Sequence, residues 1–132
     1  MARRAIKLYY MKIENTKAQM RKGLLELCVL SIISQKEAYP SDIINKLKEA
    51  KLIVVEGTLY PLLSRLKNAD LLNYEWKESK SGPPRKYYSL TDLGEEFLGG
   101  LEETWNELNH AVSQATKKTS KTPASKNSKT TK

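Results

Sequence analysis

The stretch EGTLYPLLSRLKNADLL, residues 56–72, constrains the fold more than any other part of this 132-residue chain. Its apolar residues recur three or four positions apart, which places them on one face of an α-helix. These residues are Leu59, Leu62, Leu63 and Leu66. The opposite face carries polar, cationic and aromatic groups without a carboxylate, namely Tyr60, Pro61, Ser64, Lys67 and Asn68, with Thr58 and Arg65 at its edge. The spacing therefore predicts an amphipathic helix.

Pro61 indicates where this helix begins. Proline lacks a backbone N–H and is tolerated within the first helical turn, so we expect the helix to start near Gly57 or Thr58. Thr58, Tyr60 and Pro61 then lie at the N-terminal end, which is the part of a recognition helix that meets base edges in the major groove. For this helix taken alone, an ordinary surface helix with a polar outer face is the simpler interpretation.

Two further helices are predicted upstream of this stretch. The first runs from about Glu14 to Ser34, and its second half is apolar nearly all round, which places it in the core. Residues 1–12 look like an N-terminal extension. The second helix opens with Pro40 at its first position and should end near Lys51. Together with residues 56–72, it has the outline of a helix-turn-helix.

The sequence period changes from 3.6 to 2 after the third predicted helix, which indicates a β-hairpin. Leu72, Tyr74 and Trp76 alternate with polar residues, SKSGPP (residues 79–84) interrupts the strand, and RKYYSL (residues 85–90) resumes it. A hairpin directly after a helix-turn-helix forms the wing of a winged helix, whose cations contact phosphates or enter the minor groove. Those cations are Lys80, Arg85 and Lys86. The alternative is a plain surface hairpin whose cations merely keep the chain soluble.

A last long helix is predicted over residues 91–115, with Thr91 as its N-cap. Its apolar residues repeat at intervals of three and four, the pattern of a helix that pairs with another helix. They are Leu98, Leu101, Trp105, Leu108 and Val112. We interpret this seam as a homodimer interface, and the alternative is that it packs back on its own domain. Residues 116–132, rich in Lys, Ser and Thr, are expected to be disordered.

Composition argues against several classes of protein. The chain has a single cysteine, Cys28, and a single histidine, His110. We therefore expect no intrachain disulfide, no metal or cofactor site and no catalytic triad or dyad. The net charge of +8 resides in the ends, because residues 1–12 hold four cations and residues 116–132 hold six, with no acid in either segment. No apolar run approaches the ~20 residues that span a bilayer, and no signal peptide is recognisable. We expect a cytoplasmic protein that is not an enzyme.

Two segments of the chain resemble the PadR family of bacterial transcriptional regulators. Family members carry E-x-T-L-Y-x-x-L-x-R-L, a wing that ends in R-K-Y-Y, and then L-T-x-x-G. The corresponding residues are Glu56, Thr58, Leu59, Tyr60, Leu63, Arg65 and Leu66, then residues 85–88, then Leu90, Thr91 and Gly94. Tyr39 and residues 41–43 resemble the family's Y-G-Y-x-I segment, with Pro40 where glycine is usual. The resemblance covers roughly residues 14–112.

The resemblance implies a homodimeric winged-helix repressor. In such a protein the C-terminal helix pairs with the first helix of the partner subunit, and two recognition helices reach successive major grooves of a palindromic operator. A single helix after the wing is similar to the smaller subfamily, in which a tryptophan of that helix binds planar aromatic compounds at the dimer interface. Trp105 is at the matching position, so it is a candidate ligand-binding residue; alternatively it is only the largest residue of the seam.

We therefore predict a mainly α fold with a small β-hairpin, in which residues 13–90 form a winged helix-turn-helix and residues 91–115 a dimerisation helix. The predicted function is sequence-specific DNA-binding regulation, as a repressor released by a hydrophobic small molecule. The predicted DNA-contacting residues are Ser41, Thr58, Tyr60, Pro61, Ser64, Arg65, Lys67, Lys80, Arg85 and Lys86. The alternative is a winged-helix protein–protein interaction module without DNA binding, because residues 13–115 contain 13 cations and 15 acids.

Overall fold

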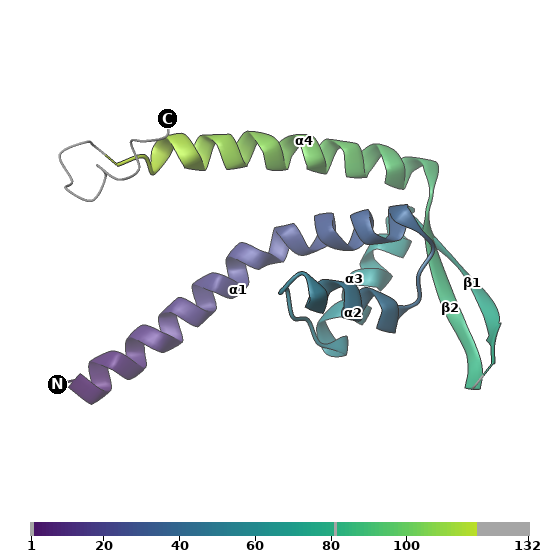
Figure 1. Cartoon of the computed structure of the whole chain (residues 1–132), viewed down its shortest axis with the longest axis horizontal. Coiled ribbons are helices and arrows are strands. Elements are labelled where there is room, and N and C mark those ends of the chain that lie inside the picture. The colour runs from purple at the N-terminus through teal and green to yellow at the C-terminus, as the bar shows by residue number, and fades with distance from the viewer. Residues whose placement is uncertain (1, 81, 119–132) are drawn as a thin grey trace. The chain divides into compact units, whose positions relative to one another are not determined.

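The computed structural model describes residues 2–80 and 82–118, and within them it has four helices and one two-stranded antiparallel hairpin (Figure 1). The helices are α1 (Ala2–Gln35), α2 (Pro40–Glu49), α3 (Glu56–Asn68) and α4 (Asp92–Ala115), and the strands are β1 (Leu72–Ser79) and β2 (Gly82–Leu90). This order confirms the predicted winged helix-turn-helix with a long C-terminal helix. The chain divides into two compact units between Gly99 and Gly100, so α4 begins in one unit and ends in the other. Most of the predicted disordered tail, from residue 119 on, lies outside the described residues.

The core of the first unit is formed by α1, α2, α3 and the base of the hairpin. One side chain from each, Leu30, Ile43, Leu63 and Leu72, is at most 1% exposed. The four leucines predicted on the apolar face of α3 are all buried, none more than 4% exposed. Because burial of apolar surface is the main driving force for folding, this packing fixes which face of α3 points outward.

Helices α2 and α3 are each followed, two residues after their last helical residue, by a residue with left-handed backbone. Lys51 has φ 68° and Asp70 has φ 64°. After each of them, a backbone N–H reaches back five residues to close the helix: that of Leu52 donates to the Leu47 carbonyl at 2.8 Å, and that of Leu71 to the Leu66 carbonyl at 3.0 Å. This Schellman arrangement satisfies the last carbonyls and turns the chain sharply.

The predicted start of α1 is wrong. The helix begins at Ala2 rather than near Glu14, so residues 2–12 of the predicted extension are helical. These residues include good helix formers such as Ala, Arg, Lys, Leu and Met and contain neither glycine nor proline. Their side chains are all exposed. A helix that buries no face needs no regular spacing of apolar residues, so the sequence pattern did not reveal it.

The predicted position of Pro61 in the first turn of α3 is also wrong. The helix begins at Glu56, one residue before the predicted start, and Pro61 lies in its second turn. Because proline has no N–H, the carbonyl of Gly57 receives no helical hydrogen bond. Gly57 is exposed, so water can satisfy this carbonyl, which explains why the helix tolerates the proline.

The hairpin differs from prediction at its tip. Strand β2 begins at Gly82, so Pro83 and Pro84 belong to the strand that they were expected to interrupt. A two-stranded sheet leaves one edge of each strand unpaired, where a proline costs no ladder hydrogen bond. The register pairs Leu72 with Leu90 at the base and becomes irregular between Lys77 and Ser79 near the tip.

The loop before α2 is paired with the base of the hairpin. The backbone N–H of Ala38 donates to the carbonyl of Tyr88 at 3.1 Å, and the N–H of Tyr88 donates to the carbonyl of Ala38 at 2.8 Å. Both side chains are buried, at about 5% exposure. The wing is therefore attached to the segment that positions the start of α2.

A compact junction joins the end of α3 to the start of α4. Thr91 caps α4 as predicted, since its Oγ1 accepts from the N–H of Gly94 at 2.9 Å. The same hydroxyl donates to the carbonyl of Asp70 at 2.6 Å, and the N–H of Thr91 donates to the carbonyl of Leu71 at 3.1 Å. A Cβ atom on Gly94 would lie 2.1 Å from the Leu71 carbonyl oxygen. The L-T-x-x-G motif is therefore explained by close backbone contact at this junction.

The first half of α1 extends past α2 and α3 (Figure 1). Residues 2–23 contain no buried side chain, and Ile13 alone among them is partly covered. Several of these exposed residues are large and apolar, including Ile6, Tyr9, Tyr10 and Met20. Within the described ranges, no helix has an apolar stretch long enough to cross a membrane.

Candidate DNA-binding surface

A groove with a volume of about 470 Å³ lies between the start of α2, the outer face of α3 and the hairpin. Three segments that are separate in the sequence meet in it. The residues that line it are Tyr39, Pro40 and Ser41, then Glu56, Tyr60 and Ser64 from α3, then Trp76, Pro84, Arg85, Lys86 and Tyr88 from the hairpin. The groove therefore combines hydroxyl, aromatic and cationic groups on one surface.

Helix α3 contributes one stripe of side chains to the groove. Glu56, Tyr60 and Ser64 are spaced four residues apart, and all three are exposed. The burial of the leucine face holds this stripe outward. Thr58 and Pro61, which were predicted to reach bases with them, are exposed as well. Thr58 lines a different groove, between α1 and the connector before α3.

The cations of the wing lie against aromatic rings. The Lys86 Nζ is 4.3 Å from the ring centroid of Tyr74 and 5.5 Å from that of Trp76. The Arg85 guanidinium is 4.2 Å from the ring centroid of Tyr39. Such cation–π contacts are favourable and restrict the positions of long, flexible side chains. Both cations are therefore held at the wall of the groove, where a polyanion would meet them.

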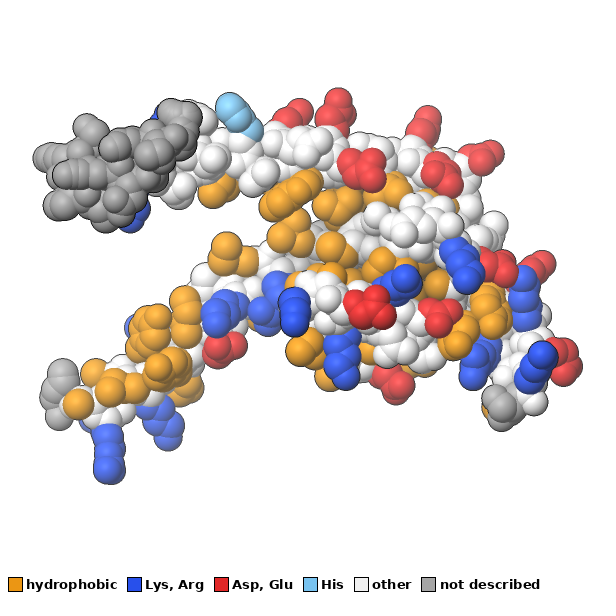
Figure 2. Space-filling view, in the orientation of Figure 1, with side chains coloured by type: hydrophobic (Ala, Val, Ile, Leu, Met, Phe, Trp, Pro, Cys, Tyr) orange, Lys and Arg blue, Asp and Glu red, His pale blue; other side chains and the backbone are white. Residues whose placement is uncertain are grey.

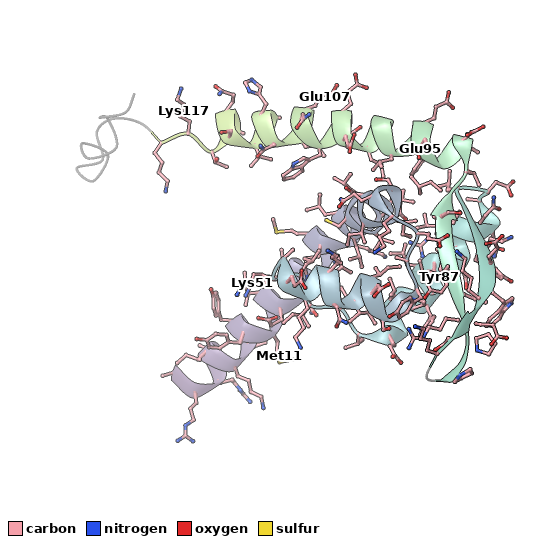
Figure 3. The ribbon with its side chains drawn as sticks, turned by 45° about the vertical axis from the view of Figure 1, so that its right-hand side comes forward. Met11, Lys51, Tyr87, Glu95, Glu107 and Lys117 are labelled. Carbon is pink, nitrogen blue, oxygen red and sulfur yellow. The ribbon has the colours of Figure 1, made fainter. Side chains whose placement is uncertain are left out.

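The face of the hairpin that carries Arg85 also contacts the loop before α2 through Tyr87 and Lys77. Tyr87, labelled in Figure 3, contacts Tyr39 edge to face with ring centroids 5.1 Å apart, and the Nζ of Lys77 is 5.3 Å from its ring. Lys77 also donates a hydrogen bond to the Glu37 carboxylate. This bond raises the pKa of Lys77. These contacts fix the orientation of the wing relative to the loop before α2.

Arg65 is placed differently from the other predicted contacts. Its Nη2 donates to the Glu26 carboxylate on α1 at 2.9 Å, and Arg65 does not line the groove. Lys67, half-buried, has its Nζ 5.8 Å from the Tyr74 ring, and Lys80 is exposed in the turn between the strands. Of the ten predicted DNA-contacting residues, five therefore line one groove: Ser41, Tyr60, Ser64, Arg85 and Lys86.

Comparison with known proteins identifies the family. The sequence model described as "Transcriptional regulator PadR-like family" matches residues 29–100. The chain belongs to the PadR-like family. A solved PadR-like transcription factor from Bacteroides fragilis is 65% identical, with a TM-score of 0.66 and coverage of 76% of this chain and 98% of that chain.

Two further PadR-like structures are also similar. A regulator from Bacillus cereus is 39% identical, with a TM-score of 0.69 and coverage of 76% of this chain and 99% of its own. One from Eggerthella lenta is 31% identical, with a TM-score of 0.76 and coverage of 86% and 99%. These similarities confirm the predicted family and the predicted class: a DNA-binding transcriptional regulator and not an enzyme.

Some residues of the groove in this PadR-like regulator were not predicted as site residues. Tyr39, Glu56 and Trp76 line it beside the predicted ones. The sequence did contain a signal for Glu56, because it precedes Tyr60 by four residues and therefore lies on the same helical face. Tyr39 comes from another element, and only the tertiary fold brings it to this surface.

The predicted dimer seam is exposed only in its later part. Leu98 is 6% exposed and packs within the regulator's own first unit, and Leu101 is half-buried. Trp105, Leu108 and Val112 are 40%, 53% and 57% exposed. Figure 2 shows acidic side chains along the same helix, which are Asp92, Glu95, Glu96, Glu102, Glu103 and Glu107. The acids lie mainly along the edge of α4 opposite to its exposed hydrophobic side chains, so a partner that covers the later seam would need an apolar face (Figure 2).

Proposed function

We propose that this PadR-like regulator represses transcription in the cytoplasm by binding, as a homodimer, to a palindromic operator. The observation that carries this proposal is the groove in which the exposed Tyr60 and Ser64 of α3 lie opposite Arg85 and Lys86 of the wing. A recognition helix presents its N-terminal residues to base edges, while cations on the flanking wing bind phosphates. The groove supplies both kinds of contact on one surface.

The contacts divide into two groups by chemistry. Side chains with short polar or flat groups on α3 are assigned to base edges: Thr58, Tyr60, Pro61 and Ser64. Cations and the hydroxyl at the start of α2 are assigned to phosphates: Ser41, Lys67, Lys80, Arg85 and Lys86. Arg65 also belongs to the phosphate-contacting group, but its contribution to DNA affinity should be smaller because its guanidinium is paired with the Glu26 carboxylate.

Two exposed apolar faces support the homodimer. On α4 the face is formed by Trp105, Leu108 and Val112, with Glu102 at its edge one turn before Trp105. The first half of α1 is apolar and basic (Figure 2), with Ile6 and Tyr9 exposed among Arg3, Arg4, Lys7 and Lys12. Exposed apolar surface of this kind marks an interaction site. We assign α4 of one copy to α1 of the other, an arrangement that covers both apolar faces and brings the cations of α1 near Glu102 at the edge of the α4 face.

Two-fold symmetry then accounts for the operator. A symmetric dimer carries two copies of α3 related by a rotation, and such a pair fits two half-sites about one helical turn apart. A planar hydrophobic effector bound beside Trp105 of both copies would change the separation of the two α3 helices and release the operator. Repression and its relief thereby depend on the same interface.

The DNA assignment is tested by a gel-shift titration on the DNA upstream of the regulator's own gene. Lys86→Ala should weaken binding about 3- to 10-fold and lower the slope of log affinity against log salt by about one. Arg65→Ala should have a smaller effect. Lys48→Ala, which removes the same charge outside the groove, serves as the control and should bind like the wild type.

Two results would contradict the proposal in different ways. If Lys86→Ala binds as tightly as the wild type, the assigned surface is wrong. If the wild type shows no salt-dependent affinity for any duplex, the chain acts instead as a winged-helix module that binds proteins.

The effector site requires a separate measurement. Because the chain has two tryptophans, Trp76→Phe leaves Trp105 as the sole indole fluorophore. Titration of this variant with a planar aromatic cation should quench its emission with saturation. A flat titration would eliminate the site at Trp105 and leave the DNA assignment intact.

A further inference from the structure

The groove contains one group that does not suit a phosphate. Among the described residues that line it, Glu56 alone is acidic, and its neighbours in the groove include Arg85 and Lys86. We infer that Glu56 contributes to sequence specificity by accepting a hydrogen bond from the amino group of a cytosine in the major groove. This inference rests on the proposed function, since it names one base that the recognition helix reads.

The position of Glu56 suits this role. It is the first residue of α3, it is exposed, and it precedes Tyr60 by one turn on the stripe that faces the groove. The N-terminal end of a recognition helix is the part that approaches base edges. The ion pairs of the described residues engage Glu14, Glu26 and Glu37 instead. The Glu56 carboxylate is thus not neutralised by any of them.

The chemistry of a carboxylate selects the base. An ionised carboxylate accepts hydrogen bonds and donates none, so it repels phosphate oxygens and the acceptor edges of guanine and thymine. Adenine offers an amino donor beside the N7 acceptor, an edge that suits an amide better than a carboxylate. Cytosine offers its N4 amino group without an acceptor of its own in the major groove. Cytosine is therefore the base that Glu56 fits.

The alternative is that Glu56 only stabilises its helix. An acid in the first turn interacts favourably with the positive end of the helix dipole, and that effect is independent of the DNA sequence. The two roles predict different results when the sequence of the DNA is varied, because only base reading changes the preference at a single position.

Selection from a library of randomised duplexes, followed by sequencing, separates the two roles. It is run in parallel with the wild-type chain, Glu56→Gln and the control Glu78→Gln, which removes the same charge from an exposed site on β1 outside the groove. The wild type and the control should prefer cytosine at one position of each half-site by roughly tenfold, within the cost of one mismatched base pair. Glu56→Gln should lose this preference and shift toward adenine, which glutamine pairs with well.

The other positions of the site should keep their preferences in Glu56→Gln, and its thermal unfolding should match that of the control. The inference is overturned if Glu56→Gln selects the same sequences as the wild type, or if it binds all sequences more tightly by one common factor. If the wild type selects no sequence at all, the proposed function itself fails. That outcome is distinct from a selective wild type whose preferences do not depend on Glu56.

Discussion

Residues of the same apolar types have different environments in two regions of the molecule. In the winged-helix body, Leu30, Leu63 and Leu72 are at most 1% exposed. On the first half of α1 and the second half of α4, Met20 is 70% exposed and Leu108 is 53% exposed. Helix α1 belongs to both regions, because it is uncovered over residues 2–23 and contributes its four buried side chains from Leu25 onward.

The apolar side chains of the body are buried within the chain itself. Those on the first half of α1 and the second half of α4 would be buried only by a second surface. The body buries its apolar faces against one another, so its packing needs no partner. The uncovered faces gain their hydrophobic stabilisation only on association. Substitutions in the first region should therefore change the stability of the fold, and substitutions in the second should change assembly.

The largest effect is expected for Leu63→Ala, in the body. Loss of a fully buried leucine side chain removes its transfer free energy and leaves a cavity, so the free energy of unfolding should fall by about 2–5 kcal/mol. Denaturant titration at one fixed protein concentration measures it. The control Ser64→Ala changes the adjacent, exposed residue on the same helix and should stay within about 0.5 kcal/mol of the wild type. Equal losses in the two variants would show that α3 does not bury its leucine face in solution.

The next effect concerns the uncovered region. Leu108→Asp should weaken self-association roughly 100-fold, or about 2.7 kcal/mol, because it places an unpaired charge within an apolar contact. Sedimentation equilibrium measures the dissociation constant, and circular dichroism checks that the helices remain. Asn106→Asp adds the same charge to an exposed residue that is neither three nor four positions from Trp105, Leu108 or Val112, so it lies off the seam and should leave association nearly unchanged. If Leu108→Asp associates like this control, the seam of α4 is not the interface.

The regular parts of the fold were predictable because burial produces periodicity. The spacing of Leu59, Leu62, Leu63 and Leu66 gave the buried face of α3, and the alternation from Leu72 gave the hairpin. The Thr91 cap was also predictable, because capping is a local interaction between neighbouring residues. The outer half of α1 was missed for the opposite reason, since exposed side chains leave no such period.

Contacts between distant segments were not predictable. The ion pair of Arg65 with Glu26 joins residues 39 positions apart, and it partly neutralises a cation that the sequence assigned to DNA. The burial of Leu98 likewise depends on the tertiary packing, whereas its spacing matched that of the exposed seam. Periodicity reveals which face of an element is apolar but not which partner covers it.

Gly94→Ala tests the junction between the body and α4. The added Cβ would lie 2.1 Å from the Leu71 carbonyl oxygen, so backbone must move and the free energy of unfolding should fall by about 1–3 kcal/mol. Gly99→Ala is the matched control on the same helix, since no atom lies within 4 Å of its added Cβ. There alanine should stabilise by about 0.5–1 kcal/mol, through its higher helix propensity. The free energy of unfolding should therefore fall in Gly94→Ala and rise in Gly99→Ala. A rise in both variants would contradict the close contact at Leu71.

The smallest effect is expected for the rate of thiol modification, which can be compared between the covered and the uncovered part of α1. Cys28 is partly covered, and burial raises the pKa of its thiol, so a smaller fraction is the reactive thiolate at neutral pH. In Met20→Cys combined with Cys28→Ser, the only thiol takes the place of a side chain that is 70% exposed. At low protein concentration, where the proposed dimer should dissociate, the wild type should react with an aromatic disulfide reagent several-fold more slowly than this variant, because its thiol is partly covered and a smaller fraction of it is thiolate. The two rates should converge in denaturant, and equal rates in the folded state would mean that the inner half of α1 is not packed against the body.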